Sequence, residues 1–274
     1  KEETRGWMSS KNFMDAVAAG FIAIDIHTGI DGFRNHPLQE SRRLDKAQHP
    51  VAVANGLDQV GVIFTTRTDP DVADPFTRQG QRFAPAVANQ GMTGTCTSWA
   101  TSYSARSILY NTTHNFVGED QKKTSFSPEF IYFRIRKDDG CRNGTYISDA
   151  LETLTKIGTV ISSDKTFDCK KTFSETDFTS ANHYKIKGSE YLISDDRDIV
   201  SIVKETLALR NQPVIVGLKL PKNSKGESSF HDIGSDGIWR ITPEEYELLK
   251  NPEIIKSGDA VTIIGYDDNP EILG

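Results

Sequence analysis

The sequence predicts an α+β fold in which a run of helices is followed by buried strands. Between residues 97 and 207, apolar side chains recur at spacings of three and four, which is the period of an amphipathic helix. The period then changes, because residues 214–220 and 260–266 are short runs rich in Val and Ile. This order along 274 residues indicates two lobes of different character around a buried core.

Four segments have the apolar period of a helix. The first covers residues 97–111, and the second begins at an N-cap serine, Ser127, followed by Pro128 in the first turn. Gly158 closes the third segment, and the fourth begins after Ser194. The residues expected to face inward are Ala100, Tyr103, Ser107 and Tyr110, then Phe130, Ile131 and Phe133, then Ile147, Ala150, Leu151 and Leu154, and finally Ile199, Ile202, Val203 and Leu207.

The chain divides into three segments. Residues 1–67 combine a short helix at 12–19 with a strand-like run at 60–66, and the Asp and Pro residues within 69–75 mark a linker. We expect residues 1–67 to be an N-terminal extension or a pro-region, which is also a candidate surface for a protein partner. Residues 68–205 form the helical lobe with the candidate nucleophile, and residues 206–274 form the β-rich lobe.

Composition excludes several classes of protein. The chain has 32 Lys and Arg against 38 Asp and Glu, a net charge of −6, whereas nucleic-acid binding needs clustered cations. The longest mostly apolar stretch, residues 16–26, is about half as long as a membrane-spanning helix. The three cysteines are isolated and the six histidines are scattered, so the sequence predicts no metal site and no cofactor. Three cysteines allow one disulfide and leave one free thiol.

Residues 89–100 carry the candidate chemistry. Two glycines in this stretch form a tight loop that delivers Cys96 to the first turn of a helix, where the helix dipole stabilises a thiolate. Gln90 can fold back beside the sulfur and, with the Cys96 backbone N–H, hold a developing oxyanion. These residues alone also fit a small buried cysteine with no chemical role, and that reading is the more common one.

The same stretch resembles the nucleophile motif of the papain-like cysteine peptidases. The resemblance implies a helical left lobe, a β-barrel-like right lobe and a cleft between them that binds extended peptide. It implies Cys96 as nucleophile and Gln90 as oxyanion donor. The matching landmarks are Gln90-Gly91, Gly94, Cys96, Trp99-Ala100, Ser127-Pro128-Glu129-Phe130, Cys141-Arg142-Asn143-Gly144, Ala150-Leu151, Asn211-Gln212-Pro213-Val214, Gly237-Ile238-Trp239 and the strand at 260–266.

The resemblance breaks down at the general base. Family members have a histidine directly before the Ala-Val strand, and this chain has Asp259 there. A second negative charge opposes thiolate formation, and moving the thiol proton to an aspartate is roughly 6 kcal/mol uphill. We therefore expect a cysteine peptidase that hydrolyses peptide bonds poorly or not at all as written. The alternative is a non-catalytic pseudoenzyme that holds a peptide or a protein partner in the cleft.

The resemblance assigns roles in the cleft to further residues. Asn143, Gly144 and Thr145 correspond to backbone that pairs with a peptide substrate, although an ordinary turn explains them equally well. His231 falls on the leaving-group side of the cleft, where it could replace the missing base or be an ordinary loop histidine. The family's orienting Asn would follow Gly274, so we expect the chain to continue and the β-rich lobe to be incomplete here.

The resemblance also pairs Cys141 with Cys169, which would contribute about 3 kcal/mol. A disulfide indicates an oxidising, extracytoplasmic or secreted location.

Overall fold

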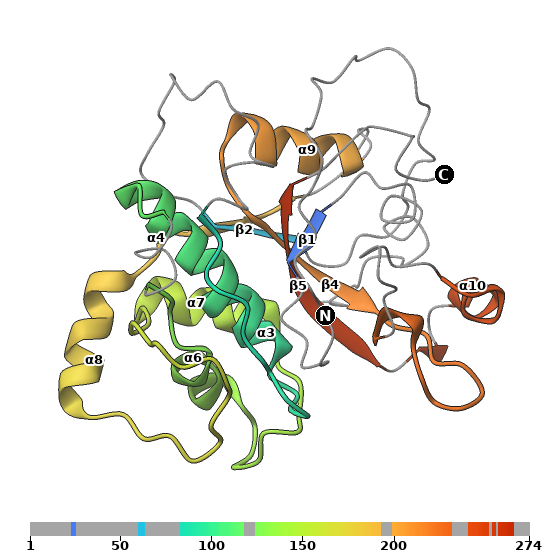
Figure 1. Cartoon of the computed structure of the whole chain (residues 1–274), viewed down its shortest axis with the longest axis horizontal. Coiled ribbons are helices and arrows are strands. Elements are labelled where there is room, and N and C mark those ends of the chain that lie inside the picture. The colour runs from blue at the N-terminus through green and yellow to red at the C-terminus, as the bar shows by residue number, and fades with distance from the viewer. Residues whose placement is uncertain are drawn as a thin grey trace, which may run out of the picture.

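The structure is a computed structural model in which helices surround one antiparallel sheet (Figure 1). This arrangement confirms the predicted α+β class. The helix expected at residues 12–19 and the linker at 69–75 lie outside the described residues. The structure describes residues 23–25, 60–63, 83–117, 124–192, 199–231, 241–251, 254–255 and 257–265.

A continuous helix begins at Cys96. It comprises α3 (Cys96–Ser98), a π-helical stretch η1 (Trp99–Arg106) and α4 (Ser107–His114), and Asn115 ends it in the left-handed conformation with φ 53°. The helix predicted over residues 97–111 is therefore confirmed. Its π-helical middle is a departure, because an apolar period of three and four does not distinguish the wider π turn from an α turn.

The next predicted helices are also confirmed. In α6 (Pro128–Ile135), the Ser127 hydroxyl accepts the backbone N–H of Phe130 at 3.1 Å, as expected for an N-cap. Helix α7 (Ile147–Lys156) ends ahead of Gly158, whose φ is +91°. A Cβ at Gly158 would lie 2.0 Å from the Ala181 carbonyl oxygen, so a larger residue does not fit. The fourth predicted helix corresponds to α9 (Ile199–Leu209).

Two helices were not predicted from the apolar period. Helix α8 (Glu175–Ala181) begins with a capping box between Ser174 and Asp177, and α10 (Pro243–Leu249) begins with one between Thr242 and Glu245. Both helices are short, and a reading of the capping boxes would have found them. Two further single turns are η2 (Asn182–Tyr184) and η3 (Ser229–His231).

Within the described residues, five strands form the sheet in the order β1-β5-β4-β2-β3, with every pair antiparallel. Three of these strands were predicted: β2 (Val60–Ile63) lies in the strand-like run at 60–66, and β4 (Val214–Lys219) and β5 (Gly258–Gly265) are the two buried strands. Val216 of β4 pairs with Val261 of β5. The other strands are β1 (Ala23–Asp25) and β3 (Ser189–Tyr191). Two segments of residues 1–67 therefore contribute strands to the sheet.

The side chains of β4 alternate between two cores on opposite faces of the sheet. Val214, Val216 and Leu218 pack in the cluster that contains the α9 residues, whereas Ile215 packs with α6 and α7. Figure 1 shows α9 on one side of the sheet and α6 and α7 on the other. The beginning of β5 thereby lies against the helix that starts at Cys96, and Ala260 packs in the same cluster as Cys96.

Within the described ranges, no helix has both the length and the apolar character that crossing a membrane requires.

Candidate functional site

The structure brings two predicted site residues together. Cys96 is the first residue of α3 and is partly buried, and Asp259 is the second residue of β5 with an exposed fraction of 7%. The two residues are neighbours, because α3 and β5 are in contact and each side chain shifts the pKa of the other. An ionised carboxylate can only accept, so the thiol would be the donor in any hydrogen bond between them.

Burial and charge keep the thiol protonated. The pKa of the Cys96 thiol lies well above its ordinary range, first because the sulfur is desolvated and then because Asp259 places a negative charge beside it. Burial also raises the pKa of Asp259 to about 6, against the opposing effect of its hydrogen-bond donors. At neutral pH the pair is therefore a neutral thiol beside a carboxylate.

Two backbone N–H groups also face this pair. The N–H groups of Thr97 and Ala260 both lower the pKa of Cys96, although less than burial and Asp259 raise it. The Ala260 N–H donates to the Asp259 carboxylate at 2.8 Å. Such backbone donors leave no signal in the sequence, because every residue except proline carries one.

Gln90 lies in the loop that leads to Cys96, and its amide is engaged within that loop. The Gln90 side-chain N–H donates to the carbonyl of Thr93 at 2.7 Å, and the Thr93 hydroxyl donates to the carbonyl of Gln90 at 2.9 Å. None of the hydrogen bonds found for Gln90 within the described part of the chain reaches Cys96. Its role as an oxyanion donor stays a prediction.

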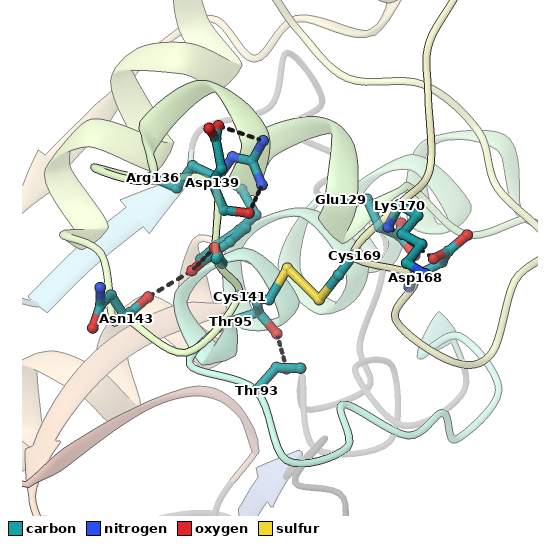
Figure 2. Close-up of a disulfide and its surroundings, with 12 residues drawn as sticks. Thr93, Thr95, Glu129, Arg136, Asp139, Cys141, Asn143, Asp168, Cys169 and Lys170 are labelled. Atoms are coloured by element: carbon teal, nitrogen blue, oxygen red, sulfur yellow. Dashed lines mark hydrogen bonds and ion pairs between the residues drawn. A yellow bond between two sulfur atoms is a disulfide. The ribbon is translucent and has the colours of Figure 1, made fainter.

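The Cys96 loop is braced by the segment that follows Cys141. The Gly94 N–H donates to the Cys141 carbonyl at 2.7 Å, and the Thr97 hydroxyl donates to the Thr145 carbonyl at 2.9 Å. The predicted disulfide between Cys141 and Cys169 is present, with a Cα–Cα distance of 6.1 Å. Figure 2 shows this disulfide beside Thr93 and Thr95, whose hydroxyls are 2.7 Å apart in the same loop. The disulfide thus anchors the surface on which the Cys96 loop rests.

The segment at Asn143 and Gly144 presents an open backbone. The Asn143 carbonyl accepts the Tyr132 hydroxyl at 2.7 Å, and the Thr145 carbonyl is already bound to Thr97. Gly144 is exposed, and a Cβ added to it would meet nothing within 4 Å. Among the described residues, no hydrogen bond reaches the backbone of Gly144. Its N–H and C=O are therefore available to a ligand.

His231 is the last residue of η3, and its side chain lies outside the described part of the structure. Its predicted place beside the leaving group stays a prediction. The described residues contain no group of three or more His, Cys, Asp and Glu side chains that could hold a metal ion.

No protein family model, curated protein or solved structure matches this chain. The relation to papain-like peptidases stays a prediction, made on the residues above.

Two side chains near the site were missed at the sequence level. Tyr132 is fully buried, and its hydroxyl fixes the Asn143 carbonyl. Thr262 is fully buried in β5, and its hydroxyl donates to the Ala100 carbonyl at 2.8 Å. A hydroxyl within an otherwise apolar strand needs a buried partner, and this was the available signal for Thr262.

Removing the Asp259 charge is expected to change how stability depends on pH. Because the folded pKa of about 6 exceeds the ordinary 3.8, the folded state holds this proton more tightly than the unfolded state does. The contribution of Asp259 to stability is therefore present below about pH 4 and is lost as pH rises to about 6.

In Asp259→Asn this loss is absent, so the variant should gain about 2–3 kcal/mol relative to the parent chain between pH 4 and 7. Urea unfolding of both proteins across this range measures the difference. A difference in unfolding free energy that does not change with pH would contradict the buried placement of this carboxyl group.

Proposed function

We propose that this chain is a papain-like protein with a helical lobe and a β-barrel-like lobe, whose cleft holds an extended peptide without cleaving it efficiently. The observation that carries the proposal is the pairing of the Cys96 thiol with the Asp259 carboxyl group. Peptide hydrolysis by a thiol needs a thiolate as nucleophile and a proton donor for the leaving amine. A neutral thiol beside a carboxylate supplies neither at neutral pH.

Peptide binding is supported by the backbone around Gly144. An extended peptide can add to an open backbone segment through main-chain hydrogen bonds, which give affinity without demanding a particular side chain. The Tyr132 hydroxyl bonds to the Asn143 carbonyl, and the Thr97 hydroxyl bonds to the Thr145 carbonyl. Because both neighbours are held, the N–H and C=O of Gly144 are already in position before a ligand binds.

A second candidate function is catalysis by Cys96 as a thiol peptidase. The N–H groups of Thr97 and Ala260 beside the sulfur favour it, because both stabilise negative charge there. A protein that only binds peptide has no need of a thiol in this position.

The disulfide between Cys141 and Cys169 supports an extracytoplasmic or secreted location, since such bonds persist in oxidising compartments.

A pool of random peptides displayed on phage tests binding. We expect the parent chain to enrich a subset of the pool and Gly144→Pro to reduce the affinity of the enriched peptides by about tenfold, because proline lacks the N–H donor. Gly144→Ala is the matched control. It keeps the N–H, its Cβ meets nothing within 4 Å, and its affinity should equal that of the parent.

Failure to enrich any peptide, or equal binding by the Pro variant, would overturn the proposed binding mode. The same enriched peptides, made with a fluorophore and a quencher, report cleavage. Cleavage by the parent chain that disappears in Cys96→Ala would establish the second candidate and reject binding without hydrolysis.

A further inference from the structure

A buried hydrogen bond joins the Cys96 helix to the Asp259 strand beside their contact. The Thr262 hydroxyl in β5 donates to the Ala100 carbonyl in η1 at 2.8 Å. Thr262 has an exposed fraction of 0% and Ala100 one of 3%, so water does not compete for this bond. The two residues are 162 positions apart in the sequence, and the bond therefore links separate parts of the fold.

The location of this bond follows from the shape of the helix. Ala100 lies in the π-helical stretch that begins three residues after Cys96. A π turn is wider than an α turn, and a side chain from outside the helix can reach its carbonyl groups. A carbonyl oxygen has two lone pairs, so the Ala100 carbonyl can accept the Thr262 hydroxyl in addition to the N–H that the π-helix supplies.

The bond lies near the site along both elements. Ala100 is four residues beyond Cys96, about one turn along the helix. Thr262 is three residues beyond Asp259 on β5, about 10 Å along the strand, and the two side chains leave opposite faces of the strand. Thr262 can therefore act on Asp259 only through the strand backbone, by holding β5 against the helix.

We propose that Thr262 is a positioning residue that holds the Asp259 strand against the Cys96 helix and thereby fixes the contact between the carboxyl group and the thiol. Without its hydroxyl, the Ala100 carbonyl would keep only its backbone partner within the π-helix, and β5 would lose this buried bond to the helix and relax away from it. The carboxyl group would then move away from the sulfur, and the thiol would ionise more easily.

Alkylation of Cys96 by iodoacetamide tests this proposal, because Cys96 is the one cysteine outside the disulfide. The reagent reacts with the thiolate, so the rate reports the thiol pKa. For the parent chain we expect a slow rate that rises with pH without reaching a plateau at pH 9. In Thr262→Val, which keeps the shape and removes the hydroxyl, the rate at pH 8 should increase about tenfold for each unit by which the pKa falls.

Three further variants distinguish a positioning role of Thr262 from a general loosening of the protein. Thr262→Ser retains the hydroxyl and should restore the parent profile. Thr101→Val removes another buried hydroxyl of the same helix, which donates to the Thr97 carbonyl at 2.7 Å within the helix, and should leave the rate unchanged. In an Asp259→Asn background, Thr262→Val should raise the rate by a smaller factor, because the charge that it positions is absent.

Parent-like alkylation in Thr262→Val, an equal rise in Thr101→Val, or an equal factor in both backgrounds would overturn the proposal. If Thr262→Val does not fold, Thr262→Ala carries the same expectation, since it also lacks the hydroxyl without preserving the bulk.

The inference rests on the proposed function only in treating the pair of Cys96 and Asp259 as the functional centre. Alkylation involves no peptide, so peptide binding can fail while the role of Thr262 holds, and the reverse result is equally distinguishable.

Discussion

Asp259→His is expected to convert Cys96 from an unreactive thiol into one that an epoxide or vinyl-sulfone reagent labels at neutral pH. The substitution removes the negative charge that opposes ionisation and supplies a group that can be positively charged beside the sulfur. Thr97 and Ala260 already direct N–H groups at the sulfur, so the new thiolate would find donors in place. Papain, the namesake of the family that this sequence resembles, is itself an example of a cysteine whose pKa a neighbouring histidine lowers.

The labelling rate at pH 7 should rise on the order of 100-fold or more, since the thiolate fraction grows tenfold for each unit by which the pKa falls. Mass spectrometry of the labelled protein measures the rate and locates the adduct. Asp259→Asn is the matched control, because it removes the charge without supplying a base, and it should label more slowly than the His variant. If the His variant labels no faster than the Asn variant, residue 259 does not act on the sulfur as proposed.

The pairing of Cys96 with Asp259 could be predicted because both residues lie in sequence motifs that resemble those of papain-like peptidases and follow the same order along the chain. The sequence also places a helix start at Cys96 and a buried strand after Asp259, so the meeting of helix and strand follows from the burial of apolar faces. Both residues lie at or next to the start of their elements. The pairing itself was predicted from the resemblance, because no local signal at Cys96 or at Asp259 specifies the other residue as its partner.

Other features of the site depend on contacts that no local pattern specifies. The amide of Gln90 could bond the sulfur or its own loop, and only the three-dimensional course of residues 90–95 selects Thr93 as its partner. Likewise, β1 and β2 are too short for a period to identify their partners, and their pairing is decided by the edges that β5 and β4 leave open. The π-helical stretch was also not predicted from the sequence, and the Thr262 hydroxyl that bonds to it comes from a distant strand.

The Asp259 carboxyl group is itself unfavourably desolvated, and it affects the protonation of the Cys96 thiol. A buried carboxyl group with a pKa of about 6 is desolvated by more than its donors compensate. The same group keeps the neighbouring thiol protonated. The proton therefore stays on the sulfur at neutral pH, whereas peptide hydrolysis requires a proton to reach the leaving group.

Gly94→Ala is expected to have the largest effect on stability of any single methyl group added near the site. A Cβ at position 94 would lie 2.4 Å from the Arg142 carbonyl oxygen and 2.7 Å from the Asn143 carbonyl carbon. These are backbone atoms in a segment anchored by the disulfide, so they cannot rotate away as a side chain could. The loop must instead move, and the hydrogen bond from Gly94 to the Cys141 carbonyl is lost with it.

We expect Gly94→Ala to lower the free energy of unfolding by about 2–4 kcal/mol, measured by urea denaturation. Because the loop leads directly into α3, its displacement should also move the sulfur from Asp259 and speed alkylation of Cys96. Gly144→Ala, on the facing segment, is the matched control, since its Cβ meets nothing within 4 Å and its stability should be unchanged within about 0.5 kcal/mol. Equal stability of the two variants would mean that the Cys96 loop does not rest against residues 141–143 and that the disulfide is not part of the support for the site.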